Sequence, residues 1–292
     1  MTAVVEVPQS KDHKGENVPV ASFLIAPRHR ATVLAFYRFA RAADDIADSA
    51  VLSAADKLRG LDALEATLLG AGSAADALPL RAALQETNLS DRHPLDLLKA
   101  FRLDVTKTRY EDWDDLIDYC RYSAMPVGRF VLDVHGESPK LWPANDALCA
   151  ALQIINHLQD CGKDYREIDR VYLPREALAA AGIDVSALAA PAASPALLRV
   201  ISGLALKNTQ LLQQSAGFSG AIADFRLALE VATIQGLAEG LNDLLLRRDP
   251  LKDRVHFGKR RLTLIALTAA GGLVGRRLGR AVGLSRGSVD NG

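Results

Sequence analysis

The segment FYRFARAADDIADS, residues 36–49, places two arginines and three aspartates within an otherwise apolar, alanine-rich stretch. On a helix with about 100° per residue, four of its polar residues fall within about 60° of one another and form one stripe. They are Tyr37, Arg41, Asp44 and Asp48. Carboxylates one turn apart repel each other unless a cation lies between them. The segment therefore predicts a buried helix whose polar stripe faces a cavity. A solvated face of Arg–Asp pairs is the alternative.

The rest of the chain also has helical periodicity. Its 292 residues are 49% hydrophobic and 24% charged, enough for a buried core without disulfides or a structural metal. No period-two pattern with a hairpin turn is present. One helix is expected at 28–48, and a second begins at the capping box at 53–56 and ends at Gly70. Further helices are expected at 76–88, 94–105, 112–135, 143–167, 195–216, 219–247 and 259–280. Residues 179–196 predict a loop or a short irregular helix. We expect one all-α domain over residues 1–292.

Composition excludes several classes of function. The formal net charge is zero, so no basic footprint for nucleic acid is present. The three cysteines form no C-x-x-C pair, and no secretory signal begins the chain, which predicts reduced thiols in a cytoplasmic protein. The six histidines show no zinc spacing, and the usual glycine-rich nucleotide loops are missing.

A second polar stripe lies in QIINHLQDCGKDYREIDRVYLP, residues 153–174. Four residues spaced along this helix fall within about 80° of one another: Gln153, Asn156, Asp160 and Asp164. Amide and carboxylate oxygens are hard donors, which Mg²⁺ prefers together with water and phosphate oxygens. Arginines near both stripes would bind the phosphate oxygens of a leaving group, namely Arg38, Arg41, Arg166 and Arg170. The two stripes together predict a Mg²⁺-diphosphate site.

At these residues the sequence resembles the squalene/phytoene synthase family. The resemblance covers roughly residues 16–255 and rests on ENVPVASFLIAPRHR (16–30), FYRFARAADDIAD (36–48), DYCRYSAMPVGRFVL (118–132) and NHLQDCGKDYREIDRVYLP (156–174). It implies an isoprenoid-synthase helical bundle around a central apolar cavity. The two aspartate motifs of the family correspond to Asp44 and Asp48, and to Asn156, Asp160 and Asp164, which would hold the metal.

The resemblance also assigns residues around the diphosphate. Positions that line the pocket in the family correspond to Ser22, Arg41, Tyr119 and Gln153, with Tyr119 a candidate acid–base partner. Tyr37, Arg38 and Arg170 are expected to join them from the helical wheel and the charge pattern. Tyr172 corresponds to a family tyrosine, but a packed tyrosine at a helix exit explains it equally well. Asp104 corresponds to a position facing the cavity, and His157 is expected to be a packed helix histidine.

Within the family, the sequence is most similar to the bacterial hopanoid branch. This implies Mg²⁺-dependent conversion of presqualene diphosphate and water into hydroxysqualene and diphosphate. Gln159 and Lys163 replace residues common in members that condense two allylic diphosphates, which favours a single diphosphate substrate. Condensation of two farnesyl diphosphates, a phytoene-type synthase, a chain-elongating prenyltransferase and a non-enzymatic helical lipid-binding module remain alternatives. Enzymes upstream and downstream in squalene synthesis are the expected partners.

The C-terminal apolar segment raises the question of a membrane. LTLIALTAAGGLVG, residues 262–275, is shorter than the roughly 20 residues that a spanning helix needs. Basic residues on both sides would suit contact with anionic lipids, and a core helix with a basic end is the alternative. The predicted location is therefore the cytoplasm, with possible peripheral contact at the inner face of the membrane.

Overall fold

The computed structural model describes residues 25–287, and these residues are almost entirely helical. The α-helices are α1 (Pro27–Ala47), α2 (Ala54–Leu68), α3 (Leu78–Thr87), α4 (Arg92–Thr106), α5 (Trp113–Ser123), α6 (Met125–Val134), α7 (Trp142–Ile168), α8 (Arg175–Ala180), α9 (Pro195–Ser215), α10 (Phe218–Ala221), α11 (Phe225–Leu245) and α12 (Lys259–Gly287). Two 3₁₀ turns, η1 (Pro139–Leu141) and η2 (Val185–Ala189), connect them. Residues 25–287 contain no strand beyond an isolated bridge between Arg109 and Val171. The all-α prediction is confirmed.

Local sequence signals set most helix boundaries. The Ser53 hydroxyl accepts a hydrogen bond from the Asp56 N–H at 3.2 Å, which caps α2, and Gly70 follows this helix with φ of +99°. The segment predicted as one helix at 112–135 is instead split at Ala124 into α5 and α6. Pro126, in the first turn of α6, lacks the N–H that a continuous helix requires.

A second predicted helix, 219–247, is also interrupted. The structure places the short α10 first and begins α11 at Phe225. The Asp224 carboxylate accepts hydrogen bonds from the N–H groups of Arg226 and Leu227 at 2.8 and 3.0 Å. This cap starts α11 as a separate helix. The prediction of helix at 219–247 was therefore right, but the prediction of one continuous helix was wrong.

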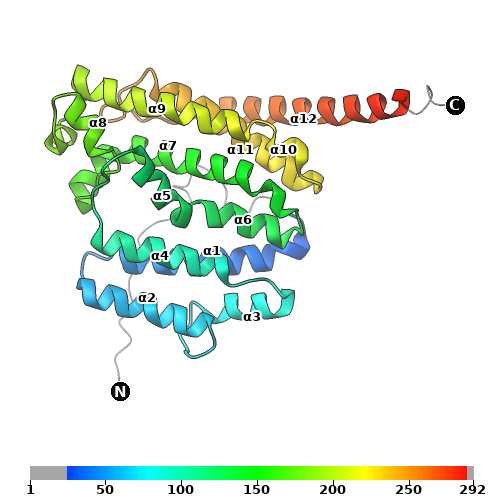
Figure 1. The fold of residues 1–292 in the computed structure, drawn as a ribbon, viewed down its shortest axis with the longest axis horizontal. Coiled ribbons are helices and arrows are strands. Elements are labelled where there is room, and N and C mark those ends of the chain that lie inside the picture. The colour runs from blue at the N-terminus through cyan, green and yellow to red at the C-terminus, as the bar shows by residue number, and fades with distance from the viewer. Residues whose placement is uncertain (1–24, 288–292) are drawn as a thin grey trace.

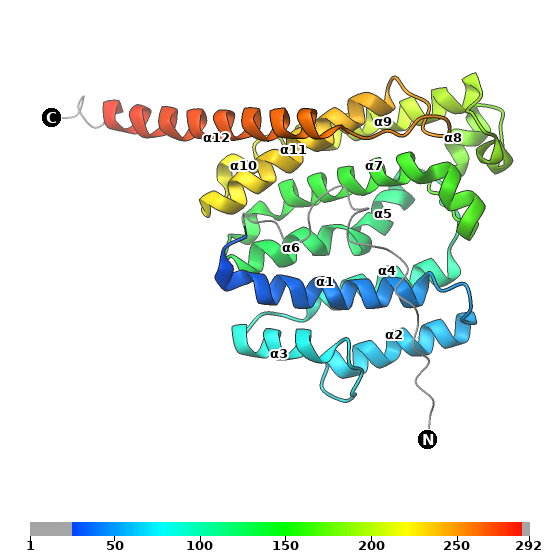
Figure 2. The same ribbon diagram turned by 180° about the vertical axis from the view of Figure 1, so that it is seen from behind.

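The helices form stacked layers (Figure 1). One buried cluster joins α1, α2, α3 and α4, with Phe130 of α6 stacked on Phe36 of α1 at a centroid distance of 4.0 Å. The larger cluster surrounds α7, which packs against α5, α6, α9 and α11. Seen from behind, α1 and α4 run below α5, α6 and α7, with α9, α11 and α12 above (Figure 2). The helix α7 therefore lies at the centre and carries the second polar stripe.

The chain turns sharply at the end of α7. Asp169 adopts a left-handed conformation with φ of +50°, and the Arg170 N–H donates to the Asp164 carbonyl at 3.2 Å. The Val171 N–H then donates to the Thr108 carbonyl at 2.9 Å, which ties this turn to the connection between α4 and α5. Residues 170–172 are thereby placed beside α4 and the end of α1.

Candidate functional site

The stripe on α1 is partly covered and already carries ion pairs. The Arg41 guanidinium lies 3.1 Å from Asp44 Oδ2 and 2.7 Å from Asp45 Oδ1. The side chains of Asp44 and Asp48 are 36% and 31% exposed, whereas the neighbouring faces of α1 are buried. Arg–Asp pairs, which the alternative of a solvated face predicts, are therefore present on α1. The other faces of this helix are packed against the core.

The stripe on α7 also remains open. Asn156 and Asp160 are exposed, and Gln153 and Asp164 are half-buried. The opposite positions of α7 are buried in the larger core cluster, among them Ile154, Ile155, Leu158 and Cys161. Packing thus holds α7 by its apolar side and leaves the oxygen donors accessible.

Arg170 connects the ends of the two stripes. Its buried guanidinium donates from Nη1 to Asp48 Oδ1 at 3.1 Å, and from Nη2 to the Asp104 carbonyl at 3.0 Å. Nη1 also lies 3.4 Å from the Tyr172 hydroxyl oxygen. A guanidinium keeps its charge at any physiological pH. A permanent cation is therefore fixed where the C-terminal ends of α1 and α7 meet, on one side of the bundle (Figure 2).

A buried acid lies directly behind this cation. The Tyr119 hydroxyl of α5 lies 2.9 and 3.0 Å from the two carboxylate oxygens of Asp104 of α4, which share its single donated proton. Burial raises the pKa of Asp104 from 3.8 to about 7, with Arg170 and Tyr119 opposing the shift and the charges of Asp48 and Asp44 adding to it. Burial also raises the pKa of Tyr119 well above its ordinary value. Tyr119 therefore stays protonated and acts as a hydrogen-bond donor.

Aromatic rings complete the wall beside Asp104. Tyr172 stacks on His157 with a centroid distance of 3.4 Å and on Tyr110 with a centroid distance of 5.4 Å, while Tyr119 is tilted against both tyrosines. Burial, with the nearby Arg170 charge, lowers the pKa of His157 to about 3, so its imidazole is neutral. His157 is buried and stacked, as a packed helix histidine would be, but its Nε2 has no hydrogen-bond partner among residues 25–287.

The donor set matches the chemistry of a hard divalent cation. Asp44 and Asp48 of α1, with Asn156, Asp160 and Asp164 of α7, present carboxylate and amide oxygens, which Mg²⁺ prefers. Within the part of the chain that the structure describes, no three or more His, Cys, Asp or Glu side chains converge closely enough to hold a metal by themselves. Oxygen donors of this kind fit Mg²⁺, which commonly also takes phosphate oxygens and water as ligands.

The other predicted site residues differ in their exposure and in their contacts. Tyr37 is partly buried, whereas Arg38 is exposed. Arg166 donates to the Leu188 carbonyl at 3.3 Å, so its guanidinium holds η2 in this structure. Ser22 lies outside the described residues. Sequence reasoning missed Tyr110, whose aromatic position next to the 118–132 motif was the available signal.

The two departures from the family pattern have structural contacts of their own. The Gln159 amide donates a hydrogen bond to the Val255 carbonyl, which attaches the segment after α11 to α7. Lys163 is exposed and lies 3.9 Å from Glu167. Preference for a single diphosphate, which these two residues suggested, stays a prediction.

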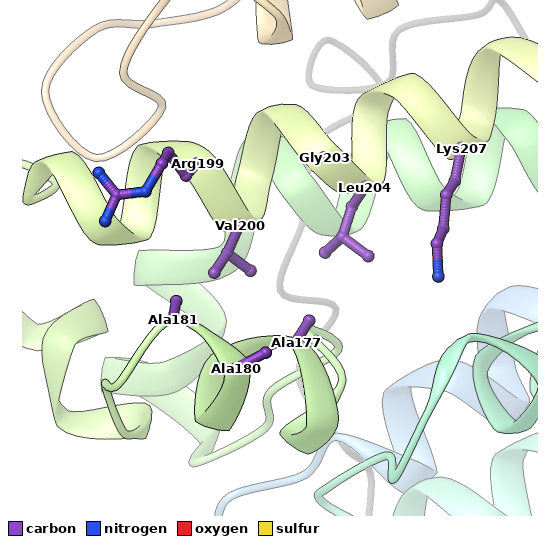
Figure 3. A pocket seen from close by; sticks show the side chains of 8 residues that line it. All are labelled: Ala177, Ala180, Ala181, Arg199, Val200, Gly203, Leu204 and Lys207. Atoms are coloured by element: carbon purple, nitrogen blue, oxygen red, sulfur yellow. The ribbon is translucent and has the colours of Figure 1, made fainter.

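A pocket elsewhere on the surface has a different character. It has a volume of about 330 Å³ and lies between α8 and α9, where Val200 and Leu204 point toward Ala177 and Ala181 (Figure 3). Its lining contains two basic residues, Arg199 and Lys207, and no carboxylate or amide side chain. It lacks the donors that a metal-diphosphate site needs.

None of the described helices, from α1 to α12, is both long enough and apolar enough to cross a bilayer.

Comparison with known proteins places these features in context. Residues 11–261 match the squalene/phytoene synthase family. The chain is 57% identical over 258 residues to a hydroxysqualene synthase from Rhodopseudomonas palustris, covering 88% of each chain. It is 53% identical over 266 residues to a hydroxysqualene synthase from Sinorhizobium fredii, covering 91% of each. The structure of a squalene synthase from Alicyclobacillus acidocaldarius superposes with a TM-score of 0.70 at 29% identity, over 78% of this chain and 87% of that one.

Proposed function

Since the chain belongs to the squalene/phytoene synthase family and is an isoprenoid synthase, we propose that it converts presqualene diphosphate and water into hydroxysqualene and diphosphate. One observation carries the proposal: Arg170 joins Asp48 of the first aspartate motif to the end of the second. The identity to hydroxysqualene synthases, above half over most of the chain, favours this branch of the family.

The reaction breaks one bond to the diphosphate and forms one bond to water. The carbon–oxygen bond of the cyclopropylcarbinyl diphosphate ionises, and both electrons leave with the diphosphate. The carbocation rearranges toward the linear thirty-carbon skeleton and is captured by the oxygen of one water molecule. Loss of a proton from that oxygen gives the alcohol, and the proton balances the released diphosphate.

Several oxygen donors are proposed to hold Mg²⁺ on the diphosphate: Asp44, Asp48, Asn156, Asp160 and Asp164. When bound, the cation would neutralise negative charge on the leaving group and so favour ionisation. Arg170 is a fixed cation at the same place and needs no reorganisation to stabilise that charge. Arg41, now paired with Asp44 and Asp45, would exchange these partners for phosphate oxygens.

We assign the remaining predicted residues to the diphosphate pocket and its wall. Tyr37, Arg38, Gln153 and Ser22 are proposed to line the pocket. Tyr119 is proposed to act by donating to Asp104, which in turn lies 3.9 Å from the Arg170 Nε. The stacked rings of Tyr172, Tyr110 and His157 present apolar faces beside the pocket, and such faces withhold water from a carbocation until it has rearranged.

We propose that residues 1–292 work as one domain in the cytoplasm. The contacts of α4 with α5 and of α6 with α7 connect the two core clusters and support this unity. Because the substrate and product are long apolar molecules, we also propose peripheral contact with a membrane. A head-to-head condensation must supply the substrate, and a reduction or cyclisation of the alcohol would consume the product.

Mass spectrometry of the products tests this function. The purified protein would be incubated with Mg²⁺ and either presqualene diphosphate or farnesyl diphosphate, each with and without NADPH. Hydroxysqualene from presqualene diphosphate without NADPH is the expected result. Product from farnesyl diphosphate would instead indicate the full condensation. If neither substrate is consumed but lipid binding persists after Asp44→Ala and Asp160→Ala, the lipid-binding module would be favoured.

A further inference from the structure

The last helix, α12, is fixed to the bundle along one side. Two glycines of α11 face this region: a Cβ atom on Gly236 would lie 3.0 Å from Ile265 Cγ2 of α12, and one on Gly240 would lie 2.7 Å from Cζ of Phe257, in the segment that leads into α12. Leu273, further along α12, is fully buried. This packing sets the rotation of α12 about its own axis. The helix runs along α11 and extends past the other helices (Figure 1).

The outer side of α12 carries an uncovered apolar stripe. Leu264, Leu267 and Val274 are 60%, 65% and 41% exposed, and a Cβ at Gly271 would meet nothing within 4 Å. These four positions fall within about 80° of one another on a helical wheel, on the side opposite Leu273. We call Leu264, Leu267, Gly271 and Val274 the outer stripe.

The positive charge of α12 indicates which kind of partner the outer stripe fits. From residue 259 to 287, the sequence has seven basic residues and no acidic one, with all seven on either side of the uncharged 262–275 segment. Arg260 and Arg261 at its start are exposed. A second copy of α12, parallel or antiparallel, would place cations against cations. An anionic lipid surface complements both basic ends and accepts the leucines between them.

We propose that the outer stripe of α12 lies in the headgroup region of an anionic bilayer, parallel to its plane. The uncharged segment is about 21 Å long at about 1.5 Å per residue, which suits a helix lying in the interface. The family match ends at residue 261, so nearly all of α12 lies beyond the matched region. The inference uses only the exposure and charge of this helix, and it holds whatever reaction the protein performs.

Flotation of the full-length protein with lipid vesicles tests the proposal. We expect binding to vesicles of phosphatidylcholine with about one third phosphatidylglycerol, weaker binding to phosphatidylcholine alone, and a loss of binding as salt screens the charges. Leu264→Glu with Leu267→Glu should lower the bound fraction at least about tenfold, because the stripe loses two leucines and gains two anions. Arg260→Glu with Arg261→Glu should remove most of the salt dependence.

The matched control introduces two glutamates at exposed apolar positions outside α12. Val51 and Leu206 are 80% and 63% exposed and lie outside α12, so Val51→Glu with Leu206→Glu should bind vesicles as the original protein does. Thermal unfolding of each variant would check that the fold is retained. Equal binding by the Leu264/Leu267 variant and this control would overturn the proposal. So would a dimer of the original protein, seen by light scattering, that the Leu264/Leu267 variant converts to a monomer without any vesicle binding.

Discussion

Arg170 and Asp48 are 122 residues apart in the chain, yet the Arg170 guanidinium donates to the Asp48 carboxylate at 3.1 Å. This contact joins the end of α7 to the end of α1. It places a permanent cation beside Asp48, in the residue that follows the turn after α7. The Asp48 carboxylate of the 36–49 segment thus has a partner from the second half of the chain.

Removal of Arg170 should destabilise the protein as well as stop the reaction. Arg170→Ala leaves the buried Asp104 and the half-buried Asp48 without their cation, and breaking a buried pair in this way costs about 3–5 kcal/mol. Urea unfolding would measure the loss. Arg175→Ala is the control, because its pair with Glu111 is exposed and such pairs contribute about 1 kcal/mol or less. Equal losses of unfolding free energy in the two variants would contradict the role of Arg170 as the buried link between α1, α4 and the end of α7.

Stability should depend on pH through Asp104. Its folded pKa, about 7, lies above the ordinary 3.8, so the folded protein binds more protons than the unfolded chain between these values. The contribution of Asp104 is therefore fully present below about pH 4 and is lost as pH rises to about 7. Asp104→Asn should give a flatter profile of unfolding free energy over this range, measured with urea in metal-free buffer. A variant profile parallel to that of the original protein would contradict this assignment.

The Tyr119 hydroxyl should act through Asp104. Tyr119→Phe removes the hydroxyl that donates to the buried Asp104 carboxylate and should cost about 1–3 kcal/mol of stability. It should also raise the pKa of Asp104 further, since Tyr119 opposes the shift caused by burial. Tyr122→Phe is the control, a partly buried tyrosine on the same helix that makes no contact with Asp104 in the described structure. Carboxyl titration by NMR distinguishes this positioning role from simple packing.

The two stripes should be essential for turnover but not for folding. Asp44→Asn and Asp160→Asn should each lower kcat by about a hundredfold or more, because each weakens a proposed ligand of the Mg²⁺ that would neutralise the charge developing on the diphosphate. Stability should be unchanged or slightly higher, since carboxylates one turn apart repel each other. Release of diphosphate would be the assay. Asp118→Asn is the control, because Asp118 forms an exposed pair with Arg121, and this variant should retain full activity. Equal activity in all three variants would show that the stripes are not part of the active site.

Local patterns predicted the helices and both stripes, because capping residues and periodicity act within a few turns. The Ser53 cap, the Gly70 terminus and the open face of α7 all agree with expectation. The breaks at Ala124 and before Phe225 were missed, because each depends on the chemistry of one residue inside an otherwise helical pattern.

The site beyond the stripes depends on contacts between distant segments. Arg170 reaches the Asp104 carbonyl because the turn after α7 bonds to the connection between α4 and α5. No spacing along the chain encodes that contact. Asp104 and Tyr119 were expected at the site from the family resemblance and Arg170 from the charge pattern, but their contacts with one another were not predicted. The Arg166 guanidinium donates to the Leu188 carbonyl, and the expectation that it assists the leaving group stays a prediction.

Isotope labelling tests the central claim, capture of the carbocation by water, most directly. The protein would convert presqualene diphosphate with Mg²⁺ in water enriched in oxygen-18, and the product would be analysed by mass spectrometry. We predict one labelled oxygen per molecule of product, located in the hydroxyl group of hydroxysqualene. An alcohol without the label, or a hydrocarbon as the main product, would contradict the account.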